Sequence, residues 1–185
     1  TEIYLRAVEH TLAQGRQAVV LVPEIALTPQ TVRRFVARFP DQVGLVHSRL
    51  SPGERYDTWR RARAGLISLV VGPRSALFTP FENLGLVVVD ESHDQSYYQG
   101  ESAPSYNARE LAAVYARQVG AVCLAGSATP DVVSTFRAAR GEYVSFPIGH
   151  AETVKAHAGL AVSIACPECG KVEAEQYADH FGLCV

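Results

Sequence analysis

The sequence has 185 residues, a formal net charge of −2 and no methionine, with 48% hydrophobic and 19% charged residues. This balance excludes a disordered chain, and no apolar run reaches the roughly 18 residues of a membrane span. No secretory signal pattern is present either, so we expect a globular domain with a small appendage. Because the chain begins with Thr1 and Glu2 rather than Met, we expect a fragment of a longer protein.

Helix and strand patterns alternate along the chain. Apolar positions spaced for one helix face predict a helix over 2–14, and the apolar run 18–22 predicts a buried parallel strand. Further helices are predicted at 28–39, 51–64, 105–117 and 131–140, and further strands at 43–46, 66–71, 84–89, 121–125 and 143–146. Repeated strand–helix units of this kind predict an α/β fold, with a parallel sheet covered on both faces.

Polar clusters follow several of the predicted strands. Ligands of open parallel sheets bind outside the carboxyl ends of the strands, so these clusters are the candidate site. They are Pro23-Glu24, Gly72-Pro73-Arg74-Ser75, Asp90-Glu91-Ser92-His93 and Gly126-Ser127-Ala128-Thr129-Pro130. Four such clusters on one edge are more than turn formation alone explains.

The cluster after the strand 84–89 is the most specific, because two adjacent carboxylates follow a buried apolar run. Asp90 suits Mg²⁺, and Glu91 suits polarisation of the water that attacks a γ-phosphate. His93 suits either sensing of the phosphate or contact with the neighbouring strand end. The alternative reading of this tetrapeptide is a solvated acidic turn.

Residues 33–74 form a basic block, with nine arginines against three carboxylates. A local block of this kind can attract a polyanion although the whole chain is acidic. The alternative is a set of solvated helix faces. The block also supports a second hypothesis of another class, a nucleic-acid-binding module without catalysis.

The strand-end motifs resemble those of superfamily 2 helicases. Residues 90–93 resemble the DExH (DEAH) box and residues 126–130 the SAT motif. Within that superfamily, residues 20–30, His47-Ser48, 72–78 and 106–112 closely resemble motifs of the PriA family of bacterial replication-restart helicases. The resemblance covers residues 1–146, and the length of the motif at 20–30 argues against another superfamily 2 translocase.

This resemblance implies a RecA-like P-loop NTPase lobe that uses ATP and Mg²⁺. It implies an ATP-driven 3′-to-5′ DNA helicase that acts on forked or single-stranded DNA in the bacterial cytoplasm, associated with the nucleoid. Primosome proteins and single-stranded-DNA-binding protein are the implied partners, and no membrane is involved. Asp90 and Glu91 would be the Walker B pair, while Ser127 and Thr129 would couple hydrolysis to unwinding.

The family pattern also assigns the first two residues. Its phosphate-binding loop ends Gly-Lys-Thr-Glu, so Thr1 would supply the magnesium-binding hydroxyl and Glu2 would close the loop. No Gly-x-x-x-x-Gly-Lys-Ser/Thr occurs in the sequence. We therefore expect the isolated chain neither to bind ATP tightly nor to hydrolyse it. With the preceding strand also missing, we expect unpaired strand edges and marginal stability.

The DNA-facing residues follow from the same motifs. Backbone amides at helix starts and an arginine suit phosphate contacts, and exposed aromatic side chains stack on unpaired bases. The segment 94–106 resembles the family's aromatic-rich loop, which links DNA binding to ATP hydrolysis. The alternative is that its tyrosines pack on a neighbouring lobe. The candidates are Pro23, Thr28, Arg74, Ser75, Tyr97, Tyr98 and Tyr106, with His47 and Arg49 as further ones.

Three of the four cysteines cluster near the end of the chain. Cys123 lies in an apolar run and is predicted to be buried. Cys166, Cys169 and Cys184 suit a Zn²⁺ site, because Cys-x-x-Cys places two thiolates at adjacent tetrahedral positions and PriA-like proteins carry a zinc-binding cysteine region. His180 or a cysteine outside this sequence would complete it, and unliganded thiols are the alternative. We expect a helicase lobe at 1–148, a linker at 149–163 and a cysteine-rich module at 164–185.

Overall fold

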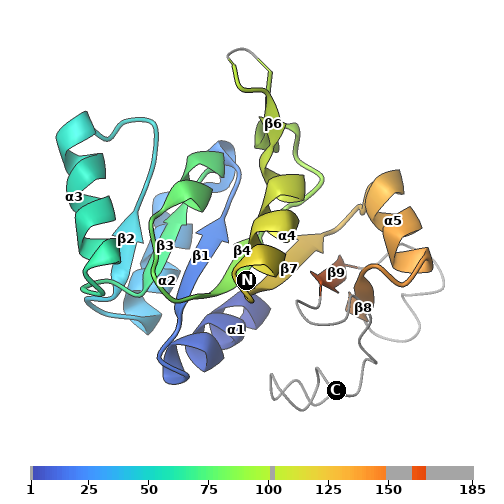
Figure 1. The fold of residues 1–185 in the computed structure, drawn as a ribbon, viewed down its shortest axis with the longest axis horizontal. Helices are drawn as coiled ribbons and strands as arrows, with labels where there is room; N and C mark the ends of the chain where they lie inside the picture. Colours follow the sequence, from blue (N-terminus) through green and yellow to red (C-terminus); the bar gives the residue numbers. More distant parts are fainter. Residues whose placement is uncertain (1, 101–102, 149–159, 166–185) are drawn as a thin grey trace.

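The computed structural model describes residues 2–100, 103–148 and 160–165. Its centre is a seven-stranded sheet with the strand order β2-β3-β1-β4-β7-β9-β8 (Figure 1). The strands of this sheet are β1 (Gln17–Leu21), β2 (Val43–Leu45), β3 (Leu69–Gly72), β4 (Leu84–Val89), β7 (Val122–Ser127), β8 (Val144–Ile148) and β9 (Leu160–Ala165). The α-helices are α1 (Glu2–Ala13), α2 (Pro29–Arg38), α3 (Pro52–Arg63), α4 (Ala108–Gln118) and α5 (Val132–Ala139).

Local sequence signals set the helix starts. The Thr28 side chain caps α2 by accepting from the Thr31 amide, and Pro29 occupies its first turn. Ser51 and Glu54 form the expected capping box at α3. These helices therefore begin within a residue of the predicted positions.

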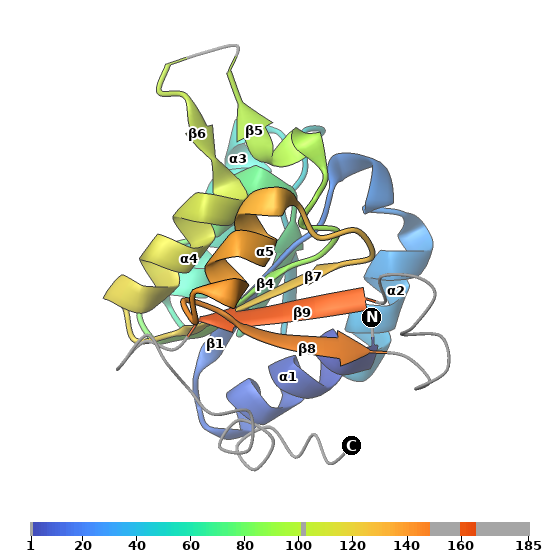
Figure 2. The same ribbon diagram turned by 90° about the vertical axis from the view of Figure 1, so that its right-hand side faces the viewer.

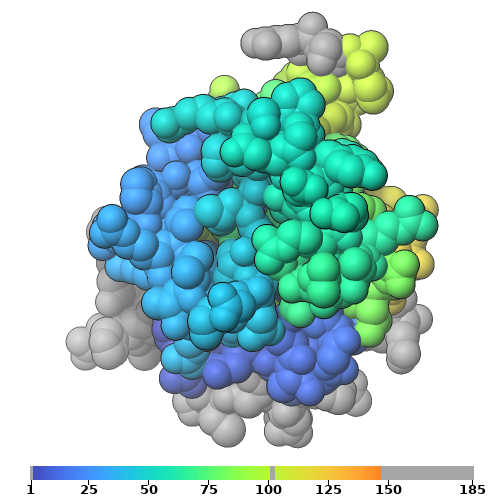
Figure 3. All heavy atoms as spheres, turned by 90° about the vertical axis from the view of Figure 1, so that its left-hand side faces the viewer, coloured from blue at the N-terminus to red at the C-terminus, as the bar shows by residue number. Residues whose placement is uncertain are grey.

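Alternating residues of the central strands divide the core into two layers. Val87 and Val89 of β4 pack with the α4 alanines on one face of the sheet. Leu86 and Val88 pack on the other face with residues of α1 and α2, among them Val8. All of these side chains are buried, which explains why the strands read as continuous apolar runs. Figure 3 shows the side of the molecule that α2, β2 and α3 form.

The sheet is mixed rather than wholly parallel. Strands β2, β3, β1, β4 and β7 run parallel to their neighbours, as predicted. Strand β9 pairs antiparallel with both β7 and β8 (Figure 2). Residues 160–165 were predicted to end a linker at 149–163 and to begin a separate module at 164. They belong instead to the central sheet, as β9. The expected unpaired edge is also absent at β7, since β4 and β9 flank it in the described residues.

A short hairpin projects from the carboxyl-end edge of the sheet (Figures 1 and 2). Its strands are β5 (Tyr98–Gln99) and β6 (Tyr106–Asn107), which pair antiparallel. The helix predicted from 105 begins three residues later, because Asn107 caps it by accepting from the Arg109 amide. In the described part of the chain, no helix is long and apolar enough to cross a membrane.

Candidate nucleotide and nucleic-acid site

The polar strand-end clusters meet at one edge of the sheet. Strands β1, β3, β4 and β7 are parallel, so the residues that follow them leave the sheet on the same side. The amide of Asp90 donates to Leu21 O at 2.9 Å, and the amide of Ser92 donates to Gly126 O at 2.8 Å. The turn after β4 is therefore fixed between the ends of β1 and β7.

The backbone of this turn is unusual at Glu91, whose φ of 45° lies in the left-handed region. That region is disfavoured for residues other than glycine and often marks functional sites. The Glu91 amide donates to Asp90 Oδ1 at 3.0 Å, which orients the Asp90 carboxylate. Both residues remain partly exposed at the edge of the sheet.

Asp90 also contacts the start of α1. Tyr4, in the first turn of that helix, is buried, and burial together with a hydrogen bond to Asp90 raises its pKa. Helix α1 therefore begins beside the carboxylates, with Glu2 in its first turn and paired to Arg6 at 3.3 Å. Thr1 lies outside the described residues.

The two carboxylates fit a magnesium ion. Among the described residues, no lysine or arginine forms an ion pair with Asp90 or Glu91, so their charge is open to a cation. Mg²⁺ in nucleotide sites typically takes one or two carboxylates and completes its shell with phosphates and water. No group of three or more His, Cys, Asp or Glu that could hold a metal is found in the described residues.

His93 connects the acidic turn to the neighbouring strand end. Its Nδ1 lies 2.7 Å from Ser127 Oγ and 3.5 Å from a carboxylate oxygen of Glu91. Ser127 is buried, and its Oγ also accepts from the Thr129 amide at 3.1 Å. The structure thus brings four of the predicted residues into one contact chain, from Glu91 to Thr129.

The strand-end residues predicted to face DNA divide into exposed and buried ones. Thr28 is exposed at the start of α2. Pro23 was predicted to contact DNA, but its side chain is buried. Arg74 and Ser75 are partly exposed in the turn after β3. The Arg74 guanidinium donates to Ser96 O at 2.8 Å, which ties this turn to the segment before the hairpin.

The three predicted tyrosines also differ in exposure. Tyr98 is 58% exposed, and Tyr106 is partly buried against Phe78, edge to face, with 5.5 Å between ring centroids. Tyr97 is only 1% exposed, and its hydroxyl donates to Asp90 O at 2.6 Å. Burial raises the pKa of Tyr97 as well. Its predicted stacking on bases is therefore wrong in this structure, and packing is its role.

Two residues at this edge of the sheet were not predicted from the sequence. Phe78 ends the motif 72–78 and is 48% exposed. An aromatic residue that close to Arg74 in the sequence could have indicated this position. Tyr4 gave no local signal, because only the three-dimensional packing of α1 brings it to Asp90.

The cysteines fall into two groups. Cys123 is buried as predicted, and burial raises the pKa of its thiol to about 12. This thiol is therefore protonated at neutral pH. Cys166, Cys169 and Cys184, with His180, lie outside the described residues, so the zinc prediction is not tested by the structure.

Comparison with protein families agrees with the fold and the edge motifs. Residues 1–136 match the DEAD/DEAH box helicase family. The chain therefore belongs to this family of ATP-dependent enzymes, for which ATP and Mg²⁺ are the implied cofactors.

Its relatives narrow the family to PriA. The chain is 50% identical over 150 residues to Replication restart protein PriA of Bacillus subtilis, an alignment that covers 81% of this chain and 18% of the relative. Identity to the PriA proteins of Chlamydia pneumoniae and Haemophilus influenzae is 50% over 144 residues and 49% over 143. Those alignments cover 78% and 77% of this chain, and 19% and 20% of the relatives. The chain is thus a PriA-family helicase segment that spans about a fifth of the length of these relatives.

Proposed function

We propose that this chain forms the ATP-binding lobe of a 3′-to-5′ DNA helicase that acts in replication restart and primosome assembly. One observation carries the proposal. The Glu91 carboxylate after β4 connects to the end of β7 through His93 and Ser127, whose Nδ1 and Oγ lie 2.7 Å apart. Two neighbouring strand ends that share such a contact can pass a change at a phosphate to the rest of the lobe.

The residues of the carboxyl-end edge take distinct roles in this proposal. Asp90, with the Thr1 hydroxyl, would hold Mg²⁺, which when bound neutralises phosphate charge. Glu91 would orient and polarise the attacking water, and its backbone is held in the left-handed region at a φ of 45°. Glu2 would lie beside the nucleotide, and Ser127 with Thr129 would couple ATP hydrolysis to DNA unwinding.

We propose that single-stranded DNA crosses the same edge. Thr28, Arg74 and Ser75 would contact phosphates, while the exposed Tyr98 and the partly exposed Tyr106 would stack on bases. Stacking does not read sequence, which suits a translocating enzyme. Primosome proteins and single-stranded-DNA-binding protein are the proposed partners, and the bacterial cytoplasm the proposed location.

The test uses a full-length protein, namely the Bacillus subtilis relative in which the aligned 150 residues of this chain replace the matching segment. We expect this test protein to hydrolyse ATP in a Mg²⁺- and DNA-dependent way, and to unwind duplexes with a 3′ single-stranded tail. Duplexes with a 5′ tail and the unaltered relative are the controls. DNA binding without hydrolysis, with the unaltered relative active, would favour the non-catalytic module instead.

We also propose a zinc site at Cys166, Cys169 and Cys184, in a small module after the lobe. The Cys-x-x-Cys spacing supports it, because two thiolates two residues apart can share one tetrahedral ion. Purified chain is expected to contain about one zinc per molecule, and Cys166→Ser is expected to lose it. Cys123→Ser is the matched control, because that thiol is buried in the sheet. Metal-free protein purified with zinc present would contradict the site.

A further inference from the structure

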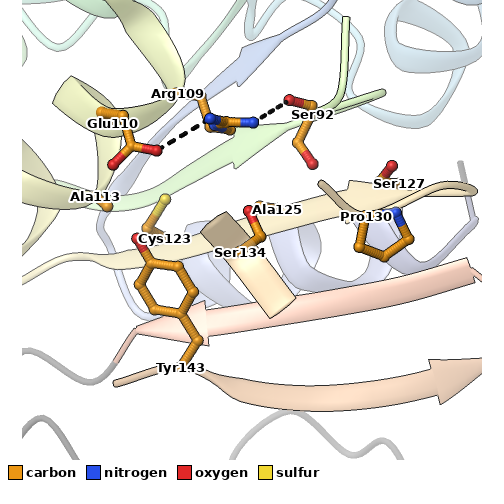
Figure 4. Close-up of a pocket in the computed structure, with 10 residues that line it drawn as sticks. All are labelled: Ser92, Arg109, Glu110, Ala113, Cys123, Ala125, Ser127, Pro130, Ser134 and Tyr143. Carbon is orange, nitrogen blue, oxygen red and sulfur yellow. Dashed lines mark hydrogen bonds and ion pairs between the residues drawn. The ribbon is translucent and has the colours of Figure 1, made fainter. Parts of the chain in front are cut away.

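The motif 106–112 places one arginine between the acidic turn and the segment after β7. Arg109 lies in the first turn of α4, where Asn107 fixes the helix start. Its Nη1 donates to the Ser92 carbonyl oxygen at 3.2 Å and forms a close ion pair with Asp131. Its Nη2 lies 3.1 Å from Glu110 Oε1, and only 18% of the side chain is exposed (Figure 4).

Asp131 is itself a fixed group, because it is the N-cap of α5. Its carboxylate accepts from the Ser134 amide at 2.9 Å and from the Ser134 hydroxyl at 3.0 Å. Burial disfavours the charged carboxylate, but the Ser134 hydrogen bonds and the Arg109 charge outweigh burial and hold the pKa of Asp131 below its ordinary value. Asp131 directly follows the strand-end residues 126–130, so the ion pair connects α4 to that segment.

The guanidinium closes one side of a cleft between α4, β7 and α5. Ser92 and Ser127 line one part of this cleft, and Cys123 and Tyr143 line another (Figure 4). Arg109 Nε is buried there without a hydrogen-bond partner among the described residues. A buried donor left unpaired lowers stability, so packing alone is a poor reason for an arginine at this position.

The position of the Ser92 carbonyl decides where His93 lies, because the two share a peptide bond. The amide of Ser92 is held by Gly126 O at 2.8 Å, and its carbonyl is held by Arg109. With both ends of Ser92 fixed, the His93 ring stays within 2.7 Å of Ser127 Oγ. Arg109 itself contacts neither Asp90 nor Glu91 in the described structure.

We propose that Arg109 is a positioning residue for ATP hydrolysis: it holds the Ser92 carbonyl and the α5 N-cap together, which keeps His93 in contact with Ser127. This role rests on the proposed function. The group acts through its neighbours, so its loss misaligns the site without removing a ligand of the nucleotide. A small misplacement of this kind lowers turnover far more than substrate binding.

The test compares Arg109→Gln with Arg137→Gln in the full-length test protein. Arg137 belongs to the same cluster, since it pairs with Glu110 and bonds Tyr143 Oη at 2.8 Å, but it does not contact Ser92. We expect Arg109→Gln to lower kcat for DNA-stimulated ATP hydrolysis about tenfold or more, with KM for ATP within about twofold. Arg137→Gln is expected to leave kcat within about twofold. Equal losses in both variants would make Arg109 merely structural and overturn the proposal.

A second measurement does not depend on activity. Hydrogen exchange of the amides at 91–94 is expected to accelerate in Arg109→Gln and to remain unchanged in Arg137→Gln. Unchanged exchange at 91–94 in Arg109→Gln would overturn the positioning role. If the unsubstituted test protein hydrolyses no ATP, the proposed function fails, and exchange alone decides the role of Arg109. Should Arg109→Gln not fold, Asp131→Asn replaces it, because asparagine still caps α5 while the ion pair is lost.

Discussion

Asp90→Asn and Glu91→Gln are each expected to lower kcat for ATP hydrolysis in the full-length test protein by about 10³-fold. Asn at 90 removes the charge that we assign to Mg²⁺, and Gln at 91 removes the group that we assign to the water. Both changes preserve the shape of the turn, whose backbone is held by Leu21 O and Gly126 O. Affinity for single-stranded DNA is expected to stay within about threefold, since neither Asp90 nor Glu91 is among the residues proposed to contact DNA.

Steady-state hydrolysis with saturating DNA measures the first effect, and fluorescence anisotropy with labelled single-stranded DNA measures the second. Asp57→Asn is the matched control, because Asp57 is an exposed carboxylate on α3 that pairs only with Arg60, at 3.4 Å, among the described residues. That variant is expected to keep kcat within about twofold. Retained turnover in both Asp90→Asn and Glu91→Gln would refute the roles assigned to the pair.

The fold was predictable wherever short-range signals decide it. The apolar run 84–89 became β4 with the predicted bounds, because a strand buried on both faces shows in the sequence as continuous hydrophobicity. Thr28 and Ser51 gave the starts of α2 and α3, because capping is local. Strand β9 was not predictable in this way, since its place depends on pairing with β7 and β8 rather than on its own residues.

The candidate site was predictable to the same extent. Parallel strands guarantee that residues after their carboxyl ends share an edge, so Asp90, His93 and Ser127 could be grouped before their contacts were known. The contact of His93 with Ser127 agrees with one of the two roles considered for His93, a link to the neighbouring strand end. Arg109 and Tyr4 reach the site across sequence separations that carry no periodic signal, and their roles emerge only from the packed structure.

Tyr97 and Tyr98 illustrate the limit most directly, because neighbouring identical residues are expected to respond in opposite ways. Tyr98→Ala is expected to weaken single-stranded DNA binding by the test protein by about 1–3 kcal/mol. The same change should alter the free energy of unfolding of the 185-residue chain by less than about 0.5 kcal/mol. The reason is that this ring is 58% exposed and free to stack on a base.

Tyr97→Ala is expected to lower the free energy of unfolding by about 3–5 kcal/mol, because it empties a fully buried ring site between the ends of β1 and β4. Tyr97→Phe keeps the ring and removes only the hydroxyl, which donates to Asp90 O and Leu21 O, so a loss of about 1 kcal/mol is expected. Urea unfolding followed by circular dichroism measures both. The packing role of Tyr97 would be contradicted if the Tyr97→Ala chain were as stable as the Tyr98→Ala chain and bound DNA more weakly. Tyr97 would then stack on bases, as the sequence alone suggested.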